Sequence, residues 1–114
     1  LLRERLEGLL PVCDNVVVLG DFNCDVSEAV HQHLGELCFL NAMATAGGGL
    51  QLTMDTADIN PWKIDHIYVS AALGSPLASA AVIRDPGFRT DPPRPAGAWD
   101  HSDHLPVRAE LNWP

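Results

Sequence analysis

At 114 residues, 46% of them hydrophobic, the chain has the size and composition of a single globular domain, which excludes collagen-like, mucin-like and fully disordered proteins. Its 15 acidic and 7 basic side chains give a net charge of -8, which disfavours a free-standing nucleic-acid binder because phosphate affinity depends on Lys and Arg. The longest apolar stretches are shorter than the roughly 20 residues that a membrane-spanning helix needs, so we expect no membrane span.

In chain order, the first predicted element is an amphipathic helix over residues 1–9, where leucines recur at helical spacing until Pro11 ends the pattern. The continuous apolar run Val16–Leu19 predicts a strand that is covered on both faces. A second helix is predicted over residues 28–37, opened by Ser27 and packed on that strand.

The second half of the chain loses periodicity over residues 45–62, which predicts a long loop. Three strands are predicted after it, over residues 64–69, 77–83 and 107–111. The proline-rich segment 85–98 predicts an irregular excursion over the surface. Strands that outnumber helices and alternate loosely with them predict an α/β or α+β fold with a mostly buried sheet.

The N-terminus has neither an initiator Met nor the apolar core of a secretory signal, and we expect the chain to be a processed or truncated segment. Its cysteines, Cys13, Cys24 and Cys38, are odd in number and form no C-x-x-C pair. This pattern predicts neither a disulfide framework nor a cysteine zinc site, and it favours a reducing, intracellular compartment.

Polar residues are most informative where they stand at the ends of buried strands, because a sheet positions such side chains rigidly. Three segments have this character: Gly20-Asp21-Phe22-Asn23, Lys63-Ile64-Asp65-His66-Ile67 and Asp100-His101-Ser102-Asp103-His104-Leu105-Pro106-Val107.

Each segment also has a simpler interpretation. Asp21 after a strand commonly caps a turn. Asp65 is harder to explain in this way, because a carboxylate among apolar strand residues is costly without a partner. His101 and His104 fit a solvated loop or half of a zinc site as well.

Together and in this order, three stretches resemble the C-terminal motifs of the endonuclease/exonuclease/phosphatase superfamily: Gly20-Asp21-Phe22-Asn23, Ile64-Asp65-His66-Ile67 and Ser102-Asp103-His104-Leu105-Pro106-Val107. This superfamily includes DNase I-like nucleases, abasic-site endonucleases, sphingomyelinases and inositol polyphosphate phosphatases. The resemblance implies the C-terminal half of a DNase I-like two-sheet β-sandwich flanked by helices. It also implies hydrolysis of a phosphate ester by in-line attack of water.

The resemblance implies a role for each matched residue. Asp21 would orient and deprotonate the attacking water, and Asn23 would donate an amide hydrogen bond to the phosphate or to that water. His104 would contact the scissile phosphate, with Asp65 accepting a hydrogen bond from the other ring nitrogen. Asp103 would be a ligand of Mg²⁺ or Mn²⁺, and Asp21, Asn23 and His104 would approach a second ion in a two-ion state.

Two residues before Asp65 are candidates for substrate binding. Trp62 could stack on the substrate and Lys63 could pair with it, although Trp62 is equally suited to anchor a loop. His31 and His33 lie two apart on the predicted second helix, so we expect them to point to different faces and to be solvated.

The resemblance covers nearly all of residues 1–114 but only about half of the family's domain, and half of such a sandwich is expected to leave an apolar sheet face open. The N-terminal half, which in the family supplies the principal metal-binding Glu, is absent, so residues 1–114 are interpreted as a partial domain whose activity needs that half as a partner. The substrate stays open between nucleic acid, lipid headgroup and inositol phosphate. An alternative is a non-catalytic remnant or interaction module that lost the metal-binding Glu, and a further alternative is a zinc module built on His101 and His104.

Overall fold

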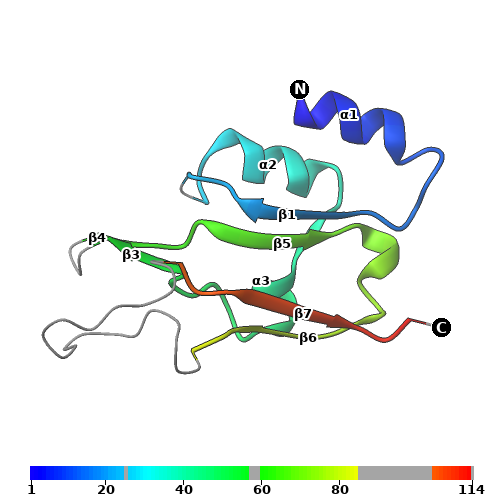
Figure 1. The fold of residues 1–114 in the computed structure, drawn as a ribbon. Helices are drawn as coiled ribbons and strands as arrows, with labels where there is room; N and C mark the ends of the chain where they lie inside the picture. Colours follow the sequence, from blue (N-terminus) through cyan, green and yellow to red (C-terminus); the bar gives the residue numbers. More distant parts are fainter. Residues whose placement is uncertain (25, 57–59, 85–103, 114) are drawn as a thin grey trace, which may run out of the picture.

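The architecture is mixed α+β, with short helices and antiparallel strands (Figure 1). The computed structural model describes residues 1–24, 26–56, 60–84 and 104–113. Within these ranges the strands form one sheet of three strands and two sheets of two strands, and every strand pair is antiparallel. The α+β class is confirmed.

The three-stranded sheet has the order β1 (Val17–Asp21), β5 (Asp65–Val69), β2 (Leu40–Asn41). The register places Leu19 opposite Ile67 and Asp21 opposite Asp65. Because β1 and β5 run in opposite directions, the end of one strand and the start of the other meet at the same end of the sheet. Two of the three polar segments are therefore neighbours.

Two helices, α1 (Leu2–Leu9) and α2 (Ala29–Glu36), lie on the same side of β1 (Figure 1). The Arg3 guanidinium joins them, since it contacts both Glu7 of α1 and Glu36 of α2. Between the helices and the sheet lies an apolar core whose buried members are Leu6, Val16, Leu34, Phe39 and Tyr68. This core confirms the predicted packing of the second helix on the first strand.

A second core joins β5 to the remaining elements. It contains buried residues of α3 (Ala42–Ala46), β5, the short 3-10 helix η1 (Ala71–Leu73) and β6 (Leu77–Val82). β6 pairs with β7 (Val107–Leu111), whose Ala109 and Leu111 pack against the same core. The predicted strands over 64–69, 77–83 and 107–111 are all present.

The loop predicted over residues 45–62 is wrong in part. Its first residues complete α3, and its end forms a two-stranded ladder of β3 (Met54–Thr56) with β4 (Asn60–Trp62). Strands of three residues surrounded by Thr, Asp and Asn show too little periodicity to be recognised, and cross-strand pairing holds them in place.

The described residues cover the first strand on one face only, which agrees with the open sheet face expected for half of a sandwich, although the apolar run alone predicts two covered faces. β1 is an edge strand of its sheet, and Val17 and Leu19 are 43% and 67% exposed. Val18, on the opposite face, packs against the helical core. An apolar run predicts that a strand has two apolar faces, but it does not reveal whether this chain supplies both covers.

Smaller differences concern boundaries and the region between β6 and β7. The α2 helix begins at Ala29, one residue later than predicted, and its N-cap residue is Glu28 instead of Ser27. The Glu28 side chain makes no capping hydrogen bond. The surface excursion predicted over 85–98 lies outside the described residues. Among the residues described, no helix has the length and apolar character to cross a membrane.

Candidate functional site

Asp21 and Asp65 meet at one end of the β1–β5 pair. Asp21 ends β1, Asp65 begins β5, and the register places them opposite each other. Opposed residues of an antiparallel ladder point to the same face, which here also carries Leu19 and Ile67. Gly20, just before Asp21, has a φ of 143°, a backbone conformation that residues with side chains rarely adopt.

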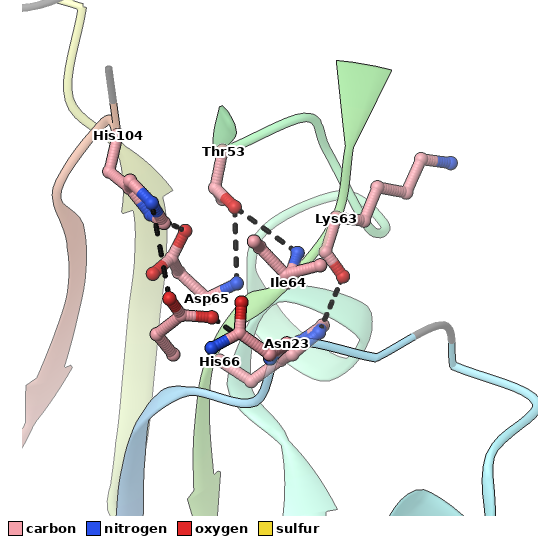
Figure 2. A network of polar contacts seen from close by, with 8 residues as sticks. Asn23, Thr53, Lys63, Ile64, Asp65, His66 and His104 are labelled. Atoms are coloured by element: carbon pink, nitrogen blue, oxygen red, sulfur yellow. Dashed lines mark hydrogen bonds and ion pairs between the residues drawn. The ribbon is translucent and has the colours of Figure 1, made fainter. Parts of the chain in front are cut away.

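His104 joins the two aspartates from a distant part of the chain. It lies before β7, and a β-bridge to Met54 holds its backbone. Its Nδ1 is 2.8 Å from Asp65 Oδ2 (Figure 2), and its Nε2 is 3.9 Å from Asp21 Oδ2. With Asp65 ionised, Nδ1 donates this hydrogen bond and Nε2 is presented toward Asp21. Asp65 is the most sheltered of the three, with 18% of its side chain exposed against 28% for His104.

The loop after β1 is folded around Asp21. Asp21 Oδ1 accepts a hydrogen bond from the Asn23 backbone N–H at 2.9 Å, and Asn23 has a φ of 50°, in the left-handed region that Asn tolerates. Part of the simple interpretation of Asp21, as a residue that shapes a turn, is therefore correct. Its second oxygen, Oδ2, is the one directed toward His104.

Thr53, which the sequence analysis did not single out, supports the start of β5 (Figure 2). Its side chain is among the most buried in the chain, and Oγ1 accepts hydrogen bonds from the backbone N–H groups of Ile64 and Asp65, at 3.3 and 3.1 Å. No periodic signal identifies this position, because the alternation from Leu50 to Met54 would place Thr53 on a polar face, whereas its side chain is buried.

His66 is fixed on the other face of β5 (Figure 2). Its Nε2 donates to the Lys63 carbonyl at 2.7 Å, and its Nδ1 accepts from the Asn41 side-chain amide at 3.0 Å. Asn41 Oδ1 in turn accepts from the first N–H groups of α3. Burial lowers the pKa of His66 below its ordinary 6.5, while the Lys63 carbonyl and the Asp65 charge oppose this effect. The ring is held neutral in one tautomer.

The expectation that His31 is solvated is wrong. His31 is 7% exposed, its Nδ1 lies 2.6 Å from the Tyr68 hydroxyl, and its ring is in edge-on contact with His66. The α2 helix turns His31 toward the sheet, whereas His33 is partly exposed in the groove between α1 and α2. Two histidines at this spacing do point to different faces, but one of the faces is the core.

Residues of the candidate site line two cavities. An open cleft of about 370 Å³ contains Asp21, Asp65 and His104, and its apolar lining is Leu19, Ile67, Leu105, Pro106 and Val107. A second cavity, of about 260 Å³, is lined by Asn23, Cys24, Met54, Trp62 and Ile64.

In the described part of the chain, the other residues predicted to bind substrate or metal do not line the open cleft. Trp62 borders the smaller cavity and is 43% exposed. The Lys63 side chain is exposed, and Figure 2 shows its ammonium group pointing away from Asp65 and His104. Asp103 and His101, proposed as a metal ligand and as part of a zinc site, lie outside the described residues.

The donor atoms of the cluster suit a hard divalent cation. One ligand atom from each of Asp21, Asp65 and His104 lies within 4.8 Å of the others. The two carboxylates supply the oxygen ligands that Mg²⁺ and Mn²⁺ accept, whereas the imidazole is also a ligand of Zn²⁺. Because Asp65 Oδ2 is engaged by His104, the oxygen most open to an ion is Asp21 Oδ2.

No protein-family model matches the chain, and no curated protein matches its sequence. Solved structures do match its fold. The 3'-5' exonuclease NExo from Neisseria meningitidis is 23% identical with a TM-score of 0.74, and the match covers 98% of this chain and 51% of that one. The 3' phosphatase NExo from Neisseria bound to a product DNA hairpin has a TM-score of 0.73 at the same identity and coverage.

A third match is an endonuclease/exonuclease/phosphatase family protein from Leptotrichia buccalis, with 17% identity and a TM-score of 0.62 over 97% of this chain and 41% of that one. These likenesses show that the chain has a partial DNase I-like fold, as the sequence motifs predicted. The chain spans about half the length of the solved structures that it matches.

Proposed function

We propose that this chain is one part of a divalent-metal-dependent phosphoester hydrolase, and that Asp21, Asn23, Asp65 and His104 carry its chemistry. The observation that carries the proposal is the position of His104, with Nδ1 bonded to Asp65 and Nε2 directed toward Asp21 in an open cleft. Similarity to phosphatase and exonuclease structures supports it.

His104 is suited to contact the phosphate through Nε2. The hydrogen bond to Asp65 fixes the ring orientation and leaves Nε2 as the atom that can face a substrate. When Nε2 is protonated, it donates to a phosphate oxygen on which negative charge develops, and this contact strengthens in the transition state.

Asp21 is suited to orient and deprotonate the attacking water. Its Oδ1 is occupied by the Asn23 backbone N–H, which restricts the rotation of the carboxylate and leaves Oδ2 for the cleft. The side-chain amide of Asn23, an exposed residue at the tip of the same turn, can donate to the phosphate or to the water.

Asp21, Asp103 and Asn23 would hold Mg²⁺ or Mn²⁺ next to His104. When bound, the cation supplies Lewis-acid stabilisation of the charge on the phosphate and the leaving group. Carboxylate and amide oxygens are the ligands that these ions prefer.

Nucleic acid is the substrate class that we favour. Trp62 offers an aromatic face beside the cavity that also contains Asn23, so a nucleotide next to the reacting phosphate can stack there. The matched Neisseria phosphatase was solved with a product DNA hairpin, and we extend this to a terminal phosphate ester of DNA as the substrate to test first.

The other half of a DNase I-like domain is the partner that we propose. It would supply the missing metal ligand and cover the exposed Val17 and Leu19, and its absence should leave residues 1–114 without detectable turnover. Exposed apolar side chains on an edge strand otherwise favour self-association.

The proposal is tested by joining the chain to an N-terminal half of a DNase I-like domain. The joined protein should release phosphate from a 3'-phosphorylated DNA hairpin with Mg²⁺ or Mn²⁺, and excess chelator should abolish the release. Full activity in chelator would overturn the metal dependence, and turnover by the 114-residue chain alone would overturn the need for a partner.

A further inference from the structure

Asp65 and His104 lie in different parts of the fold, and their hydrogen bond connects these parts. Asp65 begins β5 of the three-stranded sheet, whereas His104 precedes β7 of the β6–β7 pair. A side-chain hydrogen bond between separate elements persists only when both backbones are held in place. Thr53 provides that connection.

We propose that Thr53 is a positioning residue that keeps Asp65 and His104 within hydrogen-bonding distance. Its importance for catalysis rests on the proposed function, but the positioning itself does not. Thr53 lies immediately before β3 and is 2% exposed.

The Thr53 side chain fixes the Asp65 side of the pair. Oγ1 accepts the backbone N–H of Asp65 at 3.1 Å and that of Ile64 at 3.3 Å (Figure 2). In addition, the Thr53 N–H donates to the Trp62 carbonyl at 2.9 Å. Three hydrogen bonds thus hold the segment that enters β5 at Asp65.

The Thr53 backbone fixes the His104 side. Its carbonyl accepts the N–H of Leu105, the residue after His104, at 2.7 Å. The next residue, Met54, forms the β-bridge to His104 itself. One buried residue is therefore bonded to the backbones on both sides of the Asp65–His104 contact.

The hydroxyl is the part of Thr53 that a substitution can remove cleanly. Valine has the same shape but offers no acceptor, so Thr53→Val leaves the buried N–H groups of Ile64 and Asp65 unpaired. The start of β5 should shift to recover partners, and Asp65 Oδ2 should move away from His104 Nδ1. Thr53→Ser keeps the acceptor and should keep the pair.

Ser70 offers a matched control for a purely structural role. It is a second buried hydroxyl, 3% exposed, that accepts the Val16 N–H at 3.0 Å and donates to the Asp14 carbonyl at 2.6 Å. It follows β5 at the strand end opposite Asp65. Ser70→Ala removes the same kind of bond without touching the site.

The test is ¹⁵N NMR of the imidazole rings in the 114-residue chain with chelator present, with His104 assigned by its loss in His104→Ala. In the parent chain, His104 should carry its proton on Nδ1. In Thr53→Val, the His104 ring should change toward the mixture of tautomers that the partly exposed His33 shows. Thr53→Ser and Ser70→Ala should leave the His104 tautomer unchanged. A parent-like His104 spectrum in folded Thr53→Val would overturn the proposal, as would an equal change in Ser70→Ala.

Hydrogen exchange of the parent chain keeps the proposal testable if Thr53→Val does not fold. The amides of Ile64, Asp65 and Leu105 all bond to Thr53, so they should be protected and should open together with one free energy. Independent opening of Leu105 would contradict the proposal. Neither measurement needs turnover or metal, so a failure here is distinct from a failure of the proposed hydrolase activity.

Discussion

Asp21 and Asp65 stand directly opposite each other in the β1–β5 ladder, with the His104 ring in reach of both. Opposed like charges destabilise a strand pair, so this position is unfavourable for folding. The cost is offset when a cation or a protonated imidazole lies between the carboxylates. Such local conflicts between stability and charge placement are typical of sites that bind or react.

Asp21→Asn should therefore stabilise the 114-residue chain in the absence of metal. The substitution removes the like charge while keeping an Oδ1 acceptor for the Asn23 N–H, and the gain should be about 0.2–1 kcal/mol. Urea unfolding in chelator at pH 8 measures it. Asp14→Asn, at an exposed aspartate outside the ladder, should change stability little. A loss of stability in Asp21→Asn would contradict the proposed repulsion.

The low pKa of His66 predicts a loss of stability in mild acid. Burial puts the folded-state pKa below the ordinary 6.5, so the unfolded chain binds the proton first. The stability that neutral His66 contributes is therefore fully present above pH 6.5. It is lost as the pH falls from 6.5 toward the lower pKa of His66 in the folded chain. Each pKa unit by which the folded and unfolded states differ corresponds to a loss of about 1.4 kcal/mol in the free energy of unfolding.

Unfolding free energies between pH 7.5 and 5 measure this effect. His66→Gln removes the titrating group and should flatten the dependence, whereas His33→Gln on α2 should leave it unchanged. The same slope in His66→Gln and in the parent chain would assign the effect to another group, such as the neighbouring buried His31.

The site was predictable where local sequence determines geometry. Asp21 and Asp65 interrupt or end apolar strands, and antiparallel pairing brings such ends together. What surrounds them depends on distant partners. Thr53 is important because it bonds to Asp65 and Leu105. His31 is buried because Tyr68 faces it. Neither contact produces a periodic pattern in the sequence.

Burial was less predictable than strand position for the same reason. The run Val16–Leu19 forms the expected strand, but Val17 and Leu19 on one of its faces are exposed, and no layer formed by the described residues covers them. An apolar run in the sequence predicts that a strand has two apolar faces, but it does not reveal which of them is covered.

Trp62→Ala should weaken substrate binding in the joined protein. Loss of stacking at a half-exposed aromatic residue should raise KM for the DNA hairpin about fivefold, which corresponds to about 1 kcal/mol, with little change in kcat. Steady-state kinetics measure both constants. Trp113→Ala is the control, because Trp113 is 60% exposed and follows the last strand. An unchanged KM in Trp62→Ala would make Trp62 a loop anchor.

Leu19→Lys should reduce self-association of the 114-residue chain. Leu19 is 67% exposed on the edge strand, and a charge there opposes contact between apolar faces. Sedimentation velocity over a range of concentrations should show association of the parent chain and less association of the variant. Val12→Lys, at an 81% exposed position outside the sheet, should behave like the parent. A parent chain that stays monomeric would contradict the inferred open face.

The most direct test of the account is the turnover of His104→Ala in the joined protein, with a 3'-phosphorylated DNA hairpin and Mg²⁺. We expect kcat to fall by about two orders of magnitude or more with a smaller change in KM, because the Nε2 contact strengthens as charge develops on the phosphate. His33→Ala, at a histidine on α2 outside the cleft, should retain the parent rate. A His104→Ala protein with the parent kcat would show that the Asp21–His104–Asp65 cluster is not the catalytic site.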